Sequence, residues 1–284
     1  MTTRRATFVL MTMVGAAVLI AACSDSKSAT PTTNSSAAAA SAQSASSSAP
    51  ARPLRILVSN DDGVGAPGID ALVNALIAEP NVSVTVVAPA ENQSGTGGKT
   101  TPGTLTATTT TTASGYAATS VQGFPADAVI YGLTTVLKER PDVVITGTNF
   151  GQNIGPAIDL SGTIGAARAA AQRGIAALAV SAGLGDPVDF ATASADAVQW
   201  LRDHRAALLA SPPPAGTVDN LNAPTCTTGH VRGLVNTTPD VTATVADALA
   251  AVDCTSTEPA PSSDVAAFRA GFATLEQVPL QPAS

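Results

Sequence analysis

The chain has 284 residues and a formal net charge of −7 at pH 7, from 14 basic and 21 acidic residues. This charge argues against a protein that binds nucleic-acid polymers, because such a protein needs a basic stripe and none is visible. A hydrophobic fraction of 45% argues against full disorder.

The N-terminus, residues 1–22, has the pattern of an export signal. Arg4 and Arg5 form a positive start, and 17 uncharged residues follow them. This run is short for a membrane-spanning helix. It ends in Leu-Ile-Ala-Ala before Cys23, which resembles the bacterial lipobox, whose cysteine is acylated. We expect an exported lipoprotein, anchored by the lipid on Cys23 and facing outward in the cell envelope; an ordinary cleaved signal peptide is the alternative.

Residues 23–51 predict a flexible tether. The 28 residues from 24 to 51 contain 10 Ser, 3 Thr and 9 Ala, and no Leu, Ile, Val or aromatic residue. A segment with nothing to bury does not fold by itself. The remaining residues 52–284 are enough for one α/β domain with a core of its own. Without Arg4 and Arg5, the exported part has 12 basic and 21 acidic residues and a formal charge of −9.

The domain alternates apolar runs with stretches of helical spacing, which predicts a parallel sheet. Its first unit is a strand at 54–59, a helix at 69–78 and a β-branched strand at 82–88. Residues 93–112 predict a long Gly- and Thr-rich loop that leads into exposed hairpin strands. Further strands are expected at 116–122, 142–146, 177–181, 218–221, 231–235 and 274–278, and helices at 126–138, 163–173 and 192–209. At 241–252 the alanines favour a helix, whereas the threonines and valines oppose it.

Cys226 and Cys254 remain once Cys23 is assigned to the lipid. In an exported protein we expect them to pair and to close a loop of roughly 30 residues, which stabilises a fold by about 3–4 kcal/mol in the chain-entropy model. Two free buried thiols are the alternative. No zinc site is expected, because His204 and His230 have no ligand spacing.

Polar loops follow several of the predicted strands. Open parallel sheets bind ligands at the carboxyl ends of their strands, where loops from different strands converge. We expect a site at this edge of the sheet. Four loops stand out: Asn60-Asp61-Asp62-Gly63, Asn92-Gln93-Ser94-Gly95, Gly147-Thr148-Asn149 and Ser161-Gly162-Thr163.

Two of these loops indicate charged ligands. Asp61 and Asp62 repel each other unless a cation lies beside them, and oxygen donors suit Mg²⁺ or Mn²⁺. Residues 161–163 precede an alanine-rich helix, whose N-terminus attracts anions. The structural alternatives are an Asx-turn at the aspartates and a plain helix cap at 161–163.

Residues 63–68 also satisfy the pattern G-x-G-x-x-G between a strand and a helix. This pattern is typical of a dinucleotide site and keeps a dinucleotide-dependent oxidoreductase as a minor alternative. Two arguments oppose it. The pattern follows Asp61 and Asp62, whose charge would face a pyrophosphate, and no acidic residue directly ends the second strand.

Taken together, the loops resemble the SurE family of survival proteins, which are metal-dependent 5′/3′-nucleotidases. The resemblance covers residues 54–182 well and the rest loosely. The matching motifs are Ser59-Asn-Asp-Asp-Gly-Val, Ala66-Pro-Gly, Ala88-Pro, Asn92-Gln-Ser-Gly, Gly123-Phe-Pro-Ala-Asp, Gly147-Thr-Asn-Phe-Gly-Gln-Asn-Ile-Gly and Ser161-Gly-Thr-Ile-Gly-Ala-Ala. Residues 268–280 resemble the family's C-terminal strand.

The resemblance implies a Rossmann-like three-layer α/β/α sandwich with a mainly parallel sheet, assembled in many members as a homodimer. It also implies one divalent metal ion, of the Mg²⁺ or Mn²⁺ type, and a nucleoside monophosphate substrate. Its metal ligands correspond to Asp61, Asp62, Ser94 and Asn149, and its phosphate-binding residues to Asn149, Ser161, Gly162 and Thr163. Asp61 and Asp62 are the catalytic candidates: either accepts a proton from the attacking water, or one attacks phosphorus directly.

The chain departs from the family pattern at Gly65 and Gln93. Many members have His or Arg at the first position and Arg at the second. Residues 211–262 are remodelled around two cysteines and Pro-rich turns, in a region that often carries dimer contacts. We therefore expect a phosphomonoesterase acting on nucleoside 5′- and 3′-monophosphates. An exported metal- and phosphate-binding protein without turnover is the second hypothesis.

Overall fold

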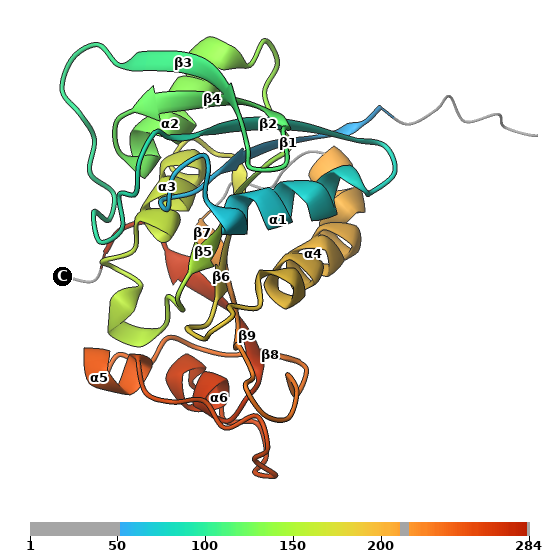
Figure 1. The fold of residues 1–284 in the computed structure, drawn as a ribbon, viewed down its shortest axis with the longest axis vertical. Coiled ribbons are helices and arrows are strands. Elements are labelled where there is room, and N and C mark those ends of the chain that lie inside the picture. The colour runs from blue at the N-terminus through green and yellow to red at the C-terminus, as the bar shows by residue number, and fades with distance from the viewer. Residues whose placement is uncertain (1–51, 211–215, 283–284) are drawn as a thin grey trace, which may run out of the picture. The chain divides into compact units, whose positions relative to one another are not determined.

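A nine-stranded sheet runs through the part of the chain that the structure describes, residues 52–210 and 216–282 of a computed structural model (Figure 1). Its order is β3-β4-β2-β1-β5-β6-β7-β9-β8, and all neighbours are parallel except β3 with β4 and β7 with β9. The strands are β1 (Leu54–Ser59), β2 (Val82–Pro89), β3 (Thr106–Thr111), β4 (Ala117–Gln122), β5 (Val143–Phe150), β6 (Ala176–Ala182), β7 (Thr217–Ala223), β8 (Leu234–Asn236) and β9 (Ala273–Pro279). The mainly parallel sheet is as predicted.

Helices cover both faces of this sheet (Figure 1). On one face lie α1 (Pro67–Ile77) and α4 (Phe190–Ala210), and on the other α2 (Pro125–Tyr131) and α3 (Gly162–Ala171). Strand β1 is buried on both sides: Ile56 packs with α1 and α4, whereas its neighbour Leu57 packs with α2 and α3. The predicted three-layer α/β/α sandwich is confirmed.

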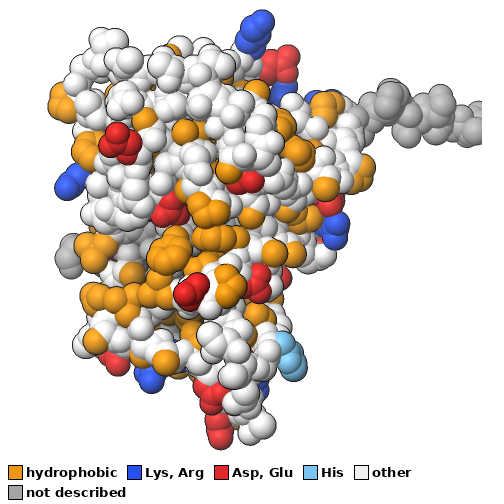
Figure 2. Space-filling view, in the orientation of Figure 1, with side chains coloured by type: hydrophobic (Ala, Val, Ile, Leu, Met, Phe, Trp, Pro, Cys, Tyr) orange, Lys and Arg blue, Asp and Glu red, His pale blue; other side chains and the backbone are white. Residues whose placement is uncertain are grey.

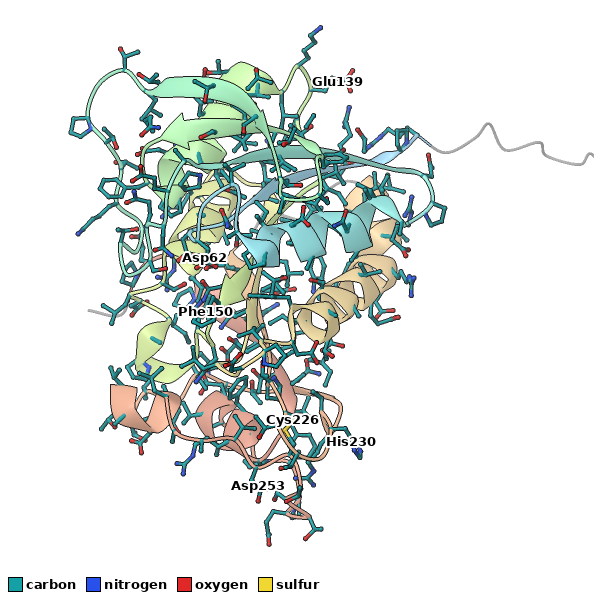
Figure 3. All side chains as sticks on the ribbon, viewed as in Figure 1. Asp62, Glu139, Phe150, Cys226, His230 and Asp253 are labelled. Carbon is teal, nitrogen blue, oxygen red and sulfur yellow. A yellow bond between two sulfur atoms is a disulfide. The ribbon has the colours of Figure 1, made fainter. Side chains whose placement is uncertain are left out.

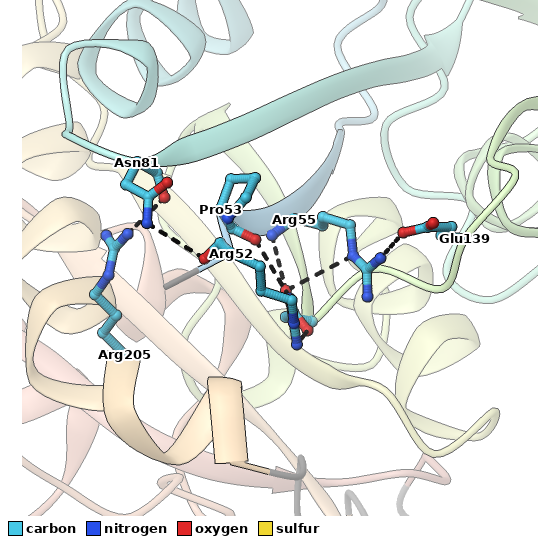
Figure 4. Close-up of polar contacts among 7 residues, drawn as sticks. Arg52, Pro53, Arg55, Asn81, Glu139 and Arg205 are labelled. Atoms are coloured by element: carbon cyan, nitrogen blue, oxygen red, sulfur yellow. Dashed lines mark hydrogen bonds and ion pairs between the residues drawn. The ribbon is translucent and has the colours of Figure 1, made fainter. Parts of the chain in front are cut away.

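The ends of β1 and β5 that lie opposite the polar loops are joined by charged side chains (Figure 4). Arg52 donates two hydrogen bonds to the Asp142 carboxylate, at 2.6 and 2.7 Å, and the Arg55 backbone N–H donates a third at 2.8 Å. Arg55 also forms an ion pair with Glu139. Burial alone raises the pKa of Asp142, but these partners bring it below its usual range. The central strand pair therefore starts in a defined register.

The structure corrects three element predictions. The helix expected at 126–138 is split into α2 and a π-helical turn at Gly132–Val136. The helix expected at 241–252 is reduced to α5 (Val245–Ala248). A helix, α6 (Asp264–Arg269), occupies the start of the segment 268–280 that resembles the family's C-terminal strand, and that strand begins only at Ala273. This helix forms because the Ser263 hydroxyl caps its N-terminus and because the helix places Phe268 in a buried core.

The C-terminal segment has a small core of its own beside the sheet. Ile154, Ala248, Val265 and Phe268 pack together; α6 lies next to β9, and α5 contacts the short 3-10 turn at Gly155–Ala157 (Figure 1). Cys226 and Cys254 form a disulfide, the pairing that the sequence predicts. Ile154 lies a few residues after Asn149 in the chain, so this core fixes the end of the segment that carries Asn149.

The predictions for residues 1–51 concern the export signal, the lipid on Cys23 and the tether. They lie outside the described residues. In the part that is described, no helix has the length and apolar composition needed to span a bilayer.

Candidate functional site

The four polar loops converge at the carboxyl ends of β1, β2 and β5 and at the N-terminus of α3. Because β2, β1 and β5 are adjacent parallel strands, their carboxyl ends share one edge of the sheet. Direct contacts between segments that are far apart in sequence bring the loops together. The predicted convergence is therefore present in the fold.

Asp61 is the most buried acidic group of this edge, with 2% of its surface exposed. Its Oδ1 accepts a hydrogen bond of 2.6 Å from the Thr163 hydroxyl. Gly162 approaches so closely that a Cβ there would lie 2.8 Å from Asp61 Oδ2. Burial raises the pKa of Asp61 to about 6, and the charge of Asp62 adds to this, although the hydrogen bond from Thr163 opposes it. No ion pair with Lys, Arg or His stabilises Asp61 within the described residues.

Asp62 lies half-buried between two other loops. Its Oδ2 accepts the backbone N–H of Phe150 at 3.0 Å, and its Oδ1 accepts the Asn92 side chain at 3.3 Å. Figure 3 shows Asp62 and Phe150 next to each other at this edge of the sheet. Burial raises the pKa of Asp62, and the hydrogen bond from Phe150 opposes that shift. Two neighbouring carboxylates are thus held in place without a counter-charge.

Ser94 is brought to this edge by the backbone before it. The Gln93 N–H donates to the Asp61 carbonyl at 2.7 Å, and the Ser94 N–H donates to the Asn92 side chain at 2.9 Å. Ser94 itself is exposed. Within the described residues its hydroxyl has no hydrogen bond to protein, so it is available to a ligand.

A register shift in β5 sets the position of Asn149. The sequence predicts that this strand ends at Thr146, but the pairing with β6 shifts register there and continues to Phe150. Gly147 adopts φ +127°, and a Cβ at this position would lie 2.2 Å from the Val180 carbonyl, so only glycine fits. The Asn149 amide nitrogen donates to the Gly151 carbonyl at 2.6 Å. Its Oδ1 is therefore the atom left to hold a cation.

The hydroxyls of Ser161 and Thr163 are already engaged. Ser161 Oγ accepts the Ile164 N–H at 3.1 Å and caps α3, and Thr163 donates to Asp61. The helix cap that the sequence offered as the structural alternative is therefore present. Of the first-turn N–H groups of α3, that of Ile164 is taken by the cap and that of Thr163 acts on Asp61, so an anion would meet the N–H of Gly162. Gly162, which packs against Asp61, brings this N–H next to the carboxylates.

The last glycine of the G-x-G-x-x-G pattern, Gly68, has a packing role. A Cβ at Gly68 would lie 1.9 Å from the Thr148 carbonyl, so glycine lets α1 begin against β5. Gly65, in contrast, has nothing within 4 Å of a built Cβ. The pattern belongs to the loop that carries the aspartates, and a pyrophosphate there would face Asp62.

The donor set fits a hard divalent cation. Within the described residues no group of three or more His, Cys, Asp or Glu could hold a metal. A cation here would therefore combine two carboxylates with the neutral oxygens of Ser94 and Asn149. Oxygen donors of this kind suit Mg²⁺ or Mn²⁺ rather than zinc. A cation would also compensate the buried charge of Asp61, which otherwise costs free energy.

Sequence reasoning missed the contacts that hold the two aspartates. Asp61 and Thr163 are 102 residues apart, and Asp62 and Phe150 are 88 residues apart. Phosphate binding by Thr163 stays a prediction, and the structure adds a contact of its hydroxyl with the Asp61 carboxylate. Phe150 was not singled out, although its place directly after Asn149 in the loop was the available signal.

Comparison with known proteins gives a consistent picture. The profile of the family described as "Survival protein SurE" matches residues 56–246. The 5′/3′-nucleotidase SurE of Yersinia enterocolitica is 38% identical over 181 residues, covering 64% of this chain and 68% of that protein. The 5′-nucleotidase SurE of Microcystis aeruginosa is 39% identical over 186 residues, covering 64% and 67%. The crystal structure of the SurE protein from Aquifex aeolicus superimposes with a TM-score of 0.64 at 26% identity, covering 81% of this chain and 95% of that one.

Proposed function

The chain belongs to the SurE family, and from this premise we propose that it is a metal-dependent phosphomonoesterase that converts nucleoside 5′- and 3′-monophosphates to nucleoside and phosphate. The observation that carries the proposal is the pair of buried Asp61 and half-buried Asp62, which lacks a cationic partner among the described residues and whose Asp61 lies against the N-terminus of α3. Relatives that carry the name 5′/3′-nucleotidase or 5′-nucleotidase support it.

One divalent ion, Mg²⁺ or Mn²⁺, would be held by the aspartates and by neutral oxygens of two other loops. When bound, it would neutralise charge on the phosphoryl oxygens and lower the pKa of a water. Asp61, Asp62, Ser94 and Asn149 are the residues that would hold it.

The chain itself positions the substrate and moves the proton. The N-terminus of α3, through the Gly162 N–H and the Ser161 hydroxyl, would bind equatorial phosphoryl oxygens and stabilise the transition state. In the proposed reaction a water attacks phosphorus, the bond between phosphorus and the ribose oxygen breaks, and the ribose oxygen takes up a proton from solvent. Asp61 or Asp62 accepts the proton of the attacking water; direct attack by one of the two carboxylates is the alternative. Thr163 and the Phe150 N–H keep the two carboxylates in place for either route.

The test is phosphate release from a panel of 5′- and 3′-nucleotides, with Mg²⁺ or Mn²⁺ and with or without EDTA. We expect release that depends on the metal and stops in EDTA. No release from any phosphomonoester with either metal would overturn the proposal.

The second candidate function is binding of metal and phosphate without turnover. Its support is that Gly65 and Gln93 occupy positions where the resemblance to the family implies cationic side chains, and that a Cβ at Gly65 would have nothing within 4 Å. Calorimetry distinguishes the two functions, because nucleotide binding in the presence of Mn²⁺ without phosphate release would favour the second.

Location and assembly are also proposals. We propose an outward-facing lipoprotein that is anchored through Cys23, because residues 1–23 resemble a lipoprotein signal. We also propose a homodimer, because the resemblance to the family implies one. Sedimentation of the purified protein tests the dimer.

A further inference from the structure

A cavity of about 660 Å³ opens beside Asp62. Its lining combines Asp62 and Asn92 with apolar residues that include Phe150, Val188 and Phe190. The two phenylalanines come from different elements, the end of β5 and the start of α4. The volume lies within the range of small-molecule sites.

The position of Phe150 is linked to the carboxylate pair. Its backbone N–H donates to Asp62, so the ring sits directly beside the site. The residue is 54% exposed. An exposed aromatic side chain does not contribute the free energy that burial of its apolar surface would give. At the mouth of a cavity it can contact a ligand instead.

The cavity and the proposed phosphate position are lined by different residues around the aspartates. Asp62 lines the cavity, whereas Ser161, Gly162 and Thr163 do not, and Gly162 is pressed against Asp61. A substrate with its phosphate at the N-terminus of α3 would therefore extend its other end into the cavity.

The charges of the cavity exclude an anionic occupant. Among the described residues that line it there is no Lys, Arg or His, and its charged members are Asp62 and Asp186. Figure 2 likewise shows hydrophobic and acidic side chains near the middle of this face, with basic ones toward its margins. The part of the substrate that enters is accordingly uncharged, as a nucleobase is, and the two phenylalanines of the lining suit a flat aromatic group.

We propose that Phe150 and Phe190 form an aromatic platform that binds the nucleobase, so that Phe150 makes the enzyme select nucleotides over phosphomonoesters that lack a base. The predicted effect on nucleotide hydrolysis rests on the proposed function. Aromatic side chains stack on every base, so the platform gives preference for a base without choosing which one.

The kinetic test compares AMP with ribose 5-phosphate for the wild type and for Phe150→Ala. Stacking on one aromatic side chain corresponds to a loss of about 10- to 100-fold on alanine substitution. We expect kcat/KM for AMP to fall by that factor more than kcat/KM for ribose 5-phosphate, mainly through KM, so that the ratio of the two values drops about 10- to 100-fold. Phe150→Trp should restore AMP hydrolysis. Leu249→Ala, which removes a comparably exposed hydrophobic side chain (51%) outside the cavity, should change neither substrate.

Equal losses on both substrates would overturn the platform, because Phe150 would then act only through Asp62. A wild type without preference for AMP would overturn it as well. Calorimetric binding of adenosine, which has no phosphate, separates this inference from the proposed function. If no phosphomonoester is hydrolysed, the proposed function fails, yet adenosine binding that Phe150→Ala weakens would still support the platform. Adenosine binding equal in both proteins would overturn it in either case.

Discussion

Asp61 is buried and negatively charged, and its hydrogen bond to Thr163 orients it without neutralising it. The affinity of this edge for a divalent cation therefore depends on the negative charge of Asp61. Replacement of Asp61 by Asn keeps the shape of the side chain and removes the charge, so the fold should be retained while the site loses a ligand.

We predict that Asp61→Asn binds Mn²⁺ at least about 100-fold more weakly, because even partners outside the ligand set change metal affinity by 10- to 100-fold. Phosphate release should fall with it. Calorimetric titration with Mn²⁺ measures the first effect, and a nucleotide assay the second. Asp203→Asn, on the exposed surface of α4, is the matched control. Wild-type affinity in Asp61→Asn would refute the role of this carboxylate.

Glu276 is a second buried acid and lies on β9. Its carboxylate accepts hydrogen bonds from Asn220 at 2.7 Å and from Thr237 at 3.3 Å. Burial, with the nearby charge of Asp264, raises its pKa to about 8. The folded protein therefore holds a proton on Glu276 that the unfolded chain releases above pH 4.5. Stability consequently falls as the pH rises from about 4.5 to 8.

We predict that Glu276→Gln stabilises the protein at pH 7.5, because glutamine is uncharged at every pH and keeps the hydrogen bond from Asn220. The gain should reach about 1–4 kcal/mol at pH 7.5 and shrink toward zero near pH 4.5. Thermal unfolding at both pH values measures it. A variant that is less stable than the wild type by the same amount at both would contradict a protonated Glu276.

At the scale of elements, strands were predicted better than short helices. The strands at 54–59, 82–88 and 177–181 are found within one residue, because β-branched and apolar runs buried on both faces leave few alternatives. In contrast, α6 has six residues and was not predicted. Its helical state comes from the Ser263 cap and from the burial of Phe268, and burial is a tertiary effect.

The disulfide joins the segment that follows β7 to the segment that precedes α6. We predict that replacing Cys226 and Cys254 together by Ser lowers the free energy of unfolding by about 2–4 kcal/mol. Nucleotide hydrolysis at 25 °C should persist, because the aspartates lie on other elements. Thermal unfolding, with reduced wild type as the control, measures the change. An unchanged unfolding temperature would mean that packing around Phe268 holds this segment alone.

At the scale of the whole molecule, the N-terminal pattern predicts where the protein resides. We predict that Cys23→Ala moves the protein from the membrane fraction to the soluble fraction of expressing cells, because a lipid chain supplies the membrane affinity. The mass of the mature N-terminus identifies the modification. A wild-type protein found soluble and without lipid would instead indicate an ordinary cleaved signal peptide.

The sequence by itself determined the α/β alternation, the mainly parallel sheet and the loops that carry Asp61 and Asp62. These features are local, since periodicity and strand-end polarity can be read within a few residues of each other. Only the tertiary structure decided that Thr163 binds Asp61, that the Phe150 N–H binds Asp62, and that the Phe150 ring faces a cavity. Each of these contacts joins residues that are far apart in the sequence. They form only because the sheet and the helices pack together, and local sequence patterns do not specify them.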